Sequence, residues 1–210
     1  MGTSGLEGLV VAIPAARRAA ETARLVERWG GIPLVGPTVQ EVAVADEGPL
    51  REATEEVIAS PLKWSVHLTG VGTRRWLNQA DTWGLLNALL EKLGSASVIP
   101  RGNKAAAALA AYGLKGAWVP EGETSREIAA WLTDRLEPGD VVALQRHGEP
   151  VPRLRKPLEV AGARIIELIP YHWDLPEDRG PAERLVSALI EGGAHALVIT
   201  SAPQVRHMFV

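Results

Sequence analysis

The sequence contains no cysteine, and this absence removes several kinds of chemistry. Without a thiol the chain forms no disulfide, supplies no thiolate metal ligand and has no cysteine nucleophile. The histidines are few and scattered along the chain: His67, His147, His172, His195 and His207. Because they lack the spacing of metal-binding motifs, we predict no metal site.

The sequence also lacks an excess of positive charge and a long apolar segment. Its net charge of -3 at pH 7 argues against general nucleic-acid binding. No apolar run approaches the length of about 20 residues that a helix needs to cross a bilayer. Met1–Gly5 lacks the basic and apolar regions of a signal peptide. We predict a cytoplasmic monomer that binds neither membrane nor nucleic acid through these residues.

Short apolar runs alternate with helical segments along the chain. Leu9–Ile13 reads as a strand, Ala15–Trp29 as a helix closed by two glycines, and Ile32–Val35 as the next strand. The same alternation predicts a further strand at Ala117–Val119, and a helix around Arg153–Val160 that breaks near Pro157. It indicates the α/β class with parallel sheets.

Two parts of the chain follow one pattern, which indicates an internal repeat. Val10–Ile13 is echoed by Val141–Leu144, and Trp64–Gly70 is echoed by His195–Ser201. Both pairs are 131 residues apart. We therefore expect two lobes of similar architecture.

The repeat also suggests how the chain divides between the lobes. Residues 8–37 and 174–210 are expected to form lobe 1, and residues 38–173 are expected to form lobe 2. The second copy stops at Val210, inside the helix that matches the first helix after Thr69. We expect lobe 1 to lack its C-terminal part, although an independently evolved, shorter lobe would look the same.

Several predicted strand-to-helix turns carry small hydroxyl residues or glycine. Backbone N–H groups at helix N-termini attract carboxylates and phosphates, so five such turns in one cleft would form a site for a polyanion. A single turn of this kind is more often only an N-cap. The candidate binding residues are Thr69, Gly70, Gly102, Asn103, Lys104, Thr124, Ser125, Gly148, Thr200 and Ser201. Basic residues near these turns, most of them expected to be solvated, are Arg17, Arg18, Arg74, Arg75, Arg101, Lys104 and Arg146.

The stretch Glu167–Pro176 contains the candidate catalytic residue. Pro170 has no N–H to donate, so it should end the preceding strand and place Tyr171 just past a strand end, where α/β clefts lie. A phenol with a pKa of about 10 stays protonated at neutral pH and can donate a hydrogen bond. The alternative is that Tyr171 and Trp173 only plug the side of a linker.

These pieces together resemble the uroporphyrinogen-III synthase family. Each motif is weak alone, but their order and spacing over nearly the whole chain are more specific. The matching stretches are Leu34–Pro37, Leu68–Gly72, Arg101–Lys104 before an alanine helix ending at Gly113, Val119–Glu121 with Thr124-Ser125, Pro170-Tyr171 and Ile199–Val205.

The resemblance implies two α/β lobes joined by a two-stranded connector, with the active cleft between them. It implies a cofactor-free lyase of tetrapyrrole and heme biosynthesis that cyclises hydroxymethylbilane, a linear tetrapyrrole, and inverts its last pyrrole ring. The family's active-site tyrosine falls on Tyr171, and its hydroxyl residues fall on Thr69 and on Thr200-Ser201.

The sequence departs from the family pattern at three places. Gly70 replaces a second hydroxyl, Ala105 replaces a threonine, and His172-Trp173 replace a common arginine–threonine pair. The Thr-Gly-Val-Gly form at Thr69–Gly72 and the Arg-Gly-x-Lys form at Arg101–Lys104 resemble those of a divergent branch, some members of which are fused to a DNA-binding regulator domain. The rival hypothesis is therefore a non-catalytic, two-lobed sensor of a tetrapyrrole or another polyanion within a regulatory protein.

Overall fold

The computed structural model describes residues 5–146 and 148–209. The chain divides into two compact units: unit 1 comprises Met1–Val42 and Trp173–Val210, and unit 2 comprises Ala43–His172. Each unit contains a parallel sheet with helices packed against it. The α/β class with parallel sheets, predicted from the alternation of strands and helices, is confirmed.

Unit 2 is organised around a parallel sheet with the strand order β5-β4-β6-β7. Parallel strands bring their carboxyl ends to one edge, and in this sheet His67 lies in register with Pro100 and Gln145. The loops that follow the four strands therefore start side by side. The strands are β4 (Leu62–His67), β5 (Ser97–Pro100), β6 (Val141–Gln145) and β7 (Arg164–Leu168).

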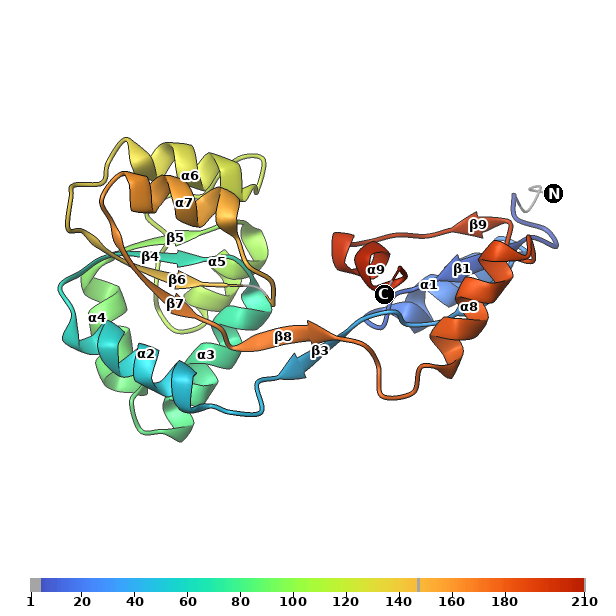
Figure 1. Ribbon diagram of the computed structural model, residues 1–210, viewed down its shortest axis with the longest axis horizontal. Coiled ribbons are helices and arrows are strands. Elements are labelled where there is room, and N and C mark those ends of the chain that lie inside the picture. The colour runs from blue at the N-terminus through green and yellow to red at the C-terminus, as the bar shows by residue number, and fades with distance from the viewer. Residues whose placement is uncertain (1–4, 147, 210) are drawn as a thin grey trace. The chain divides into compact units, whose positions relative to one another are not determined.

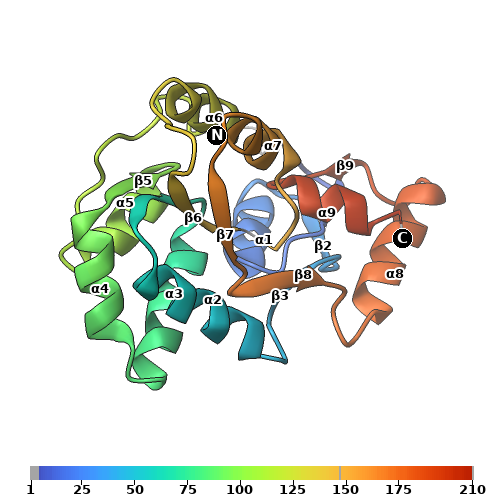
Figure 2. The same ribbon diagram turned by 60° about the vertical axis from the view of Figure 1, so that its left-hand side comes forward.

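Helices cover both faces of this sheet, as parallel sheets require. In Figure 1, α2, α3 and α4 lie on one side of the sheet, and α6 and α7 lie on the other. Helices α6 and α7 run next to each other in both views (Figure 1, Figure 2). The helices are α2 (Gly48–Ala59), α3 (Gly70–Thr82), α4 (Leu86–Ser95), α5 (Asn103–Ala110), α6 (Ser125–Thr133) and α7 (Pro152–Val160).

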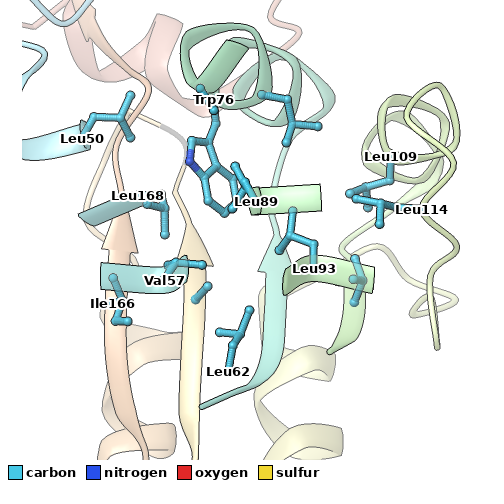
Figure 3. Close-up of a cluster of buried hydrophobic side chains, with 14 of the residues drawn as sticks. Leu50, Val57, Leu62, Trp76, Leu89, Leu93, Leu109, Leu114, Ile166 and Leu168 are labelled. Carbon is cyan, nitrogen blue, oxygen red and sulfur yellow. The ribbon is translucent and has the colours of Figure 1, made fainter. Parts of the chain in front are cut away.

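Unit 2 has a separate hydrophobic core on each face of its sheet. Figure 3 shows the core under α2, α3 and α4, in which Trp76 packs near Leu89 and Leu168. The indole N–H of Trp76 donates to Thr54 Oγ1 at 2.9 Å, so burial leaves this polar group satisfied. On the opposite face, residues such as Leu144 pack under α6 and α7.

Unit 1 has a smaller parallel sheet with the order β2-β1-β9. Val11, Ile13 and Val26 form the buried cluster between this sheet and α1. The last strand of this sheet has only two residues. The elements are β1 (Val10–Ile13), α1 (Ala19–Arg28), β2 (Ile32–Val35), α8 (Gly180–Ile190), β9 (Ala196–Leu197) and α9 (Ala202–His207).

The two sheets share one strand order, which agrees with the internal repeat. In the repeat, β1 corresponds to β6 and β9 corresponds to β4. Strands β1 and β9 are parallel neighbours in the sheet of unit 1, and their counterparts β6 and β4 are parallel neighbours in the sheet of unit 2. The helix after β1 leads to β2, as the helix after β6 leads to β7. The 131-residue repeat in the sequence thus corresponds to a repeat in the sheet topology.

A two-stranded sheet contains the points at which the chain changes unit. It consists of β3 (Gln40–Ala43) and β8 (Tyr171–Asp174). The main sheet does end before Pro170, because β7 stops at Leu168. The residues directly after Pro170 form the strand β8.

Two local predictions were wrong. Ala117–Val119 is not a strand: only the Ala117 N–H bonds to β5, at 2.7 Å to Val98 O, and Trp118 stacks on Trp131 instead. The helix α7 does not break at Pro157. A proline lacks one backbone donor, and burial of Leu154 and Leu158 on either side of it keeps this helix in place.

Candidate functional site

Thr69 stands at the start of α3, just past the carboxyl end of β4. Its backbone is extended (φ -145, ψ 144), and its Oγ1 accepts the Gly72 N–H at 3.0 Å, which caps the helix. Its own N–H donates to Gln145 Oε1 at 3.3 Å, and its carbonyl accepts the Thr73 hydroxyl at 2.9 Å. Every polar group of Thr69 is therefore oriented by a neighbour.

The Tyr171 hydroxyl lies 3.3 Å from Thr69 Oγ1, although 102 residues separate the two in the sequence. The Tyr171 side chain is only 1% exposed, and the guanidinium of Arg75 lies over its ring at 5.6 Å from the centroid. Thr69 Oγ1 accepts from Gly72 and still has one lone pair and one proton, so either hydroxyl can be the donor in the contact with Tyr171.

Gly70 brings the start of α3 against the start of α5. A Cβ at position 70 would overlap the carbonyl group of Lys104. No residue larger than glycine fits there unless the backbone of α5 moves. The missing second hydroxyl at this position therefore has a packing cause.

The N-terminus of α5 already holds a carboxylate of the chain itself. Glu123 Oε1 accepts the Asn103 N–H at 3.0 Å. The side chain passes so close to Gly102 that a Cβ there would lie 2.5 Å from its carboxyl carbon. Glu123 has φ 52, a left-handed conformation that is uncommon for residues other than glycine. Lys104, also in this turn, is exposed.

Arg101 is a half-buried cation near both the Tyr171 hydroxyl and the Glu123 carboxylate. Its N–H donates to the carbonyl of His67 at 2.8 Å, which fixes it at the carboxyl end of β5. Burial lowers the pKa of its guanidinium, while the nearby Tyr171 hydroxyl and Glu123 carboxylate act in the opposite direction. Within residues 5–146 and 148–209, no hydrogen bond or ion pair engages this guanidinium. Arg101 thus places a positive charge near both Tyr171 and the Glu123 carboxylate.

The turn at Thr124-Ser125 is occupied by a capping box. Thr124 Oγ1 accepts the Glu127 N–H at 3.2 Å, and the Glu127 carboxylate accepts the Thr124 N–H at 3.1 Å. The hydrogen bond from the Thr124 hydroxyl is the main reason that the pKa of Glu127 is lowered. Gly148, half-buried, lies in a bend after β6.

Thr200 and Ser201 lie in unit 1, at the start of the six-residue helix α9. Their N–H groups both donate to Gln204 Oε1, at 2.9 and 3.3 Å. Gln204 in turn donates to the Thr200 hydroxyl at 2.9 Å. These groups satisfy one another locally, as do those of the Thr124 turn.

Three residues that hydrogen-bond to Thr69, Arg101 or Asn103 in the candidate site of unit 2 were not among the sequence candidates. Gln145 and His67 end buried strands with polar side chains, and a polar residue closing an apolar run is a signal that could have been used. Glu123 carries no comparable signal, because its role depends on a left-handed backbone and on the packing of the loop against α5.

The protein thus has two parallel α/β units of one strand order, and unit 2 carries hydroxyl and cationic groups at the carboxyl edge of its sheet, where open α/β sheets bind ligands. The chain belongs to the uroporphyrinogen-III synthase family. The family model described as "Uroporphyrinogen-III synthase HemD" matches residues 20–210.

Individual relatives agree with this assignment. The chain is 32% identical over 208 residues to "Uncharacterized protein YjjA" of Bacillus subtilis, covering 98% of this chain and 75% of the relative. It is 31% identical to "Putative uroporphyrinogen-III synthase" of Methanothermobacter thermautotrophicus, covering 91% and 73%. A crystal structure of mutant uroporphyrinogen III synthase from Thermus thermophilus matches with a TM-score of 0.80 and 31% identity, covering 96% and 76%.

Residues 5–146 and 148–209 contain neither a candidate membrane span nor a candidate metal cluster. In that part of the chain, no helix combines the length and the apolar composition that crossing a bilayer requires. Over the same residues, no three histidine, aspartate or glutamate side chains come together in a way that could hold a metal ion.

Proposed function

We propose that this protein is a uroporphyrinogen-III synthase, a lyase of porphyrin and heme biosynthesis that cyclises hydroxymethylbilane. The observation that carries the proposal is the half-buried guanidinium of Arg101 near the Tyr171–Thr69 hydroxyl pair. A hydroxyl donor next to a fixed positive charge suits a substrate that combines a departing hydroxyl with many carboxylates. Membership of the synthase family supports the same reaction.

In the proposed reaction, Tyr171 donates a hydrogen bond to the terminal hydroxyl of hydroxymethylbilane. The C–O bond breaks, water leaves, and an electrophilic azafulvene remains. The substituted α-carbon of the last pyrrole ring then attacks this carbon to form a spiro intermediate, and the bond from that α-carbon to its own methylene bridge breaks. The bridge carbon bonds instead to the other α-carbon of the same ring. Loss of the proton on that carbon, which balances the proton taken up by the departing hydroxyl, restores the pyrrole and gives the type III macrocycle. The 3.3 Å contact with Thr69 would hold the phenol oxygen in place while it assists the leaving group.

Arg101 and the start of α5 are proposed to bind acetate or propionate carboxylates of the substrate. The Asn103 N–H points at Glu123 in this structure, so a substrate carboxylate would take the place of that side chain. Lys104 is exposed beside the same turn and adds positive charge. The bound carboxylates would hold a flexible linear substrate in the shape that favours closure.

A second candidate function is favoured by the burial of Tyr171. A side chain with 1% exposure cannot reach a substrate unless its surroundings open, and a binding protein has no need of that opening. On this reading the protein would bind a tetrapyrrole as a sensor without turning it over. The two functions share a ligand class and differ in whether product forms.

Incubating the chain with hydroxymethylbilane separates the two candidates. A synthase gives mostly type III uroporphyrinogen, whereas spontaneous closure gives type I. A sensor would bind uroporphyrin measurably while the product remains type I at the uncatalysed rate. If the chain neither changes the isomer ratio nor binds uroporphyrin, both candidates are wrong.

A further inference from the structure

His67 is a buried, titratable residue that the proposed reaction does not use. It ends β4, and its side chain has 0% exposure. Its Nε2 lies 3.0 Å from Ser65 Oγ, and its Nδ1 lies 3.1 Å from Thr73 Oγ1. Its ring stacks on that of Trp76, with 5.7 Å between centroids and 29° between planes. Both ring nitrogens are therefore engaged on the side of the sheet that faces α3.

The direction of each hydrogen bond in this group follows from counting protons. A carbonyl oxygen only accepts, so the 2.9 Å contact between Thr73 Oγ1 and Thr69 O uses the single hydroxyl proton of Thr73. Thr73 Oγ1 can then only accept from His67, which places the ring proton on Nδ1. A neutral imidazole has one ring proton, so Nε2 is bare and accepts from the Ser65 hydroxyl.

Burial keeps the imidazole in this neutral form. Removal from water lowers the pKa of His67 to about 3, so the ring does not protonate near neutral pH. The hydrogen bonds then run in one direction from Ser65 through His67 and Thr73 to the carbonyl of Thr69. Each side-chain donor in this series has an acceptor.

This series of hydrogen bonds ends on the residue that holds Tyr171. The Thr69 carbonyl is fixed by Thr73, and the Thr69 hydroxyl lies 3.3 Å from that of Tyr171. The carbonyl of His67 itself accepts the Arg101 N–H at 2.8 Å. His67 thus contacts Thr73, in the turn that holds Thr69, through its side chain, and it contacts Arg101 through its backbone carbonyl.

We infer that His67 is a positioning residue: as the Nδ1–H tautomer it orients Thr73, which holds Thr69 so that its hydroxyl meets Tyr171. An apolar side chain could fill the same space and stack on Trp76, but it could not set the direction of the Thr73 hydroxyl. A fully satisfied buried network fixes one geometry, which is the property a site needs behind its reacting groups. The kinetic part of this inference rests on the proposed function.

The tautomer can be tested without any substrate. In the full chain labelled with 15N at histidine, the His67 ring should show a protonated Nδ1 and an unprotonated Nε2 at pH 7. The matched variants are Thr73→Val, which keeps the shape and removes the hydroxyl, and Thr73→Ser, which keeps the hydroxyl. The 13Cζ signal of Tyr171 should shift in Thr73→Val and stay near its wild-type position in Thr73→Ser. A His67 ring protonated at Nε2, or equal Tyr171 signals in both variants, overturns the inference.

Kinetics with hydroxymethylbilane give the second readout. Thr73→Val should lower kcat by about ten-fold or more, the scale of a misplaced hydrogen-bond donor, with KM changed by less than about three-fold. Thr73→Ser should recover most of kcat. Equal kcat in the two variants contradicts the inference. If the wild-type chain forms no type III product, the proposed function fails on its own, and the two nuclear magnetic resonance readouts still decide the role of His67.

Discussion

The carbonyl group of Lys104 occupies the space that a Cβ at Gly70 would need. This contact joins the first turns of α3 and α5 and places the Thr69 turn beside the Arg101–Lys104 turn. The two turns come from different strands, so their distance depends on how closely the two helices approach each other. A glycine at position 70 sets that distance.

Replacing Gly70 should therefore destabilise unit 2. Gly70→Ala is expected to lower the free energy of unfolding by about 1 to 3 kcal/mol, because the backbone of α5 must shift to make room. The matched control is Gly94→Ala in α4, where nothing lies within 4 Å of the added Cβ. That change should leave stability equal or raise it by up to about 1 kcal/mol. Urea denaturation measures both, and equal costs would show that the contact with Lys104 is unimportant.

The buried His67 should make stability depend on pH. Its pKa in the folded chain is about 3, below its ordinary value of 6.5, so the unfolded chain binds more protons between these two values. Its contribution to stability is then complete above pH 6.5 and falls as the pH drops towards 3. From about pH 7 to about 4.5 this histidine alone should remove about 2 to 3 kcal/mol.

The measurement is the free energy of unfolding against pH for wild type and for His67→Asn. Carboxylates contribute equally to both curves, so the difference between them isolates the histidine. The variant should be less stable at pH 7 and show a shallower loss on acidification. Parallel curves would mean that His67 does not titrate on unfolding as the structure requires.

Glu123 should compete with ligand carboxylates at the start of α5. Because its Oε1 accepts the Asn103 N–H at 3.0 Å, Glu123→Gln removes a negative charge from the proposed carboxylate position. We expect uroporphyrin to bind about two- to ten-fold more tightly to the variant, the scale of one weakened charge repulsion in a partly exposed site. Glu121→Gln, in the same loop and also exposed, should change the affinity by less than about two-fold. Unchanged or weaker binding to Glu123→Gln would place the carboxylates elsewhere.

Much of the fold could be predicted because it depends on local pattern. Apolar runs of strand length, such as Val141–Leu144, alternate with helices, and the 131-residue echo indicates that one topology occurs twice. The failures arise where tertiary contacts decide. Ala117–Val119 has the composition of a strand, but Trp118 stacks on Trp131 and the backbone bonds to β5 only through the Ala117 N–H.

The candidate site was predictable in its residue types more than in its contacts. Pro170 indicated that the chain leaves the main sheet just before Tyr171, and the position of Thr69 before a helix indicated an N-cap. Their 3.3 Å contact could not be predicted, since it depends on how β8 and α3 pack. The hydrogen bond from the Asn103 N–H to the Glu123 carboxylate could not be predicted either, because it requires a left-handed backbone at Glu123 in a loop with no repeating pattern.

The central claim is that the Tyr171 hydroxyl assists the departure of water, and one comparison of variants tests it. Tyr171→Phe keeps the ring and its contact with Arg75 and removes only the hydroxyl near Thr69. Tyr112→Phe is the matched control, because the hydroxyl of Tyr112 bonds to Asn78 on the surface of unit 2, away from Thr69.

The measurement is the rate of type III uroporphyrinogen formation from hydroxymethylbilane, with spontaneous type I product as the internal reference. Tyr171→Phe should fold normally, bind uroporphyrin nearly as well as wild type and form type III product about ten- to a thousand-fold more slowly. Tyr112→Phe should retain the wild-type rate. If Tyr171→Phe instead keeps the wild-type rate while losing stability, the tyrosine is a structural plug and the proposed mechanism is wrong.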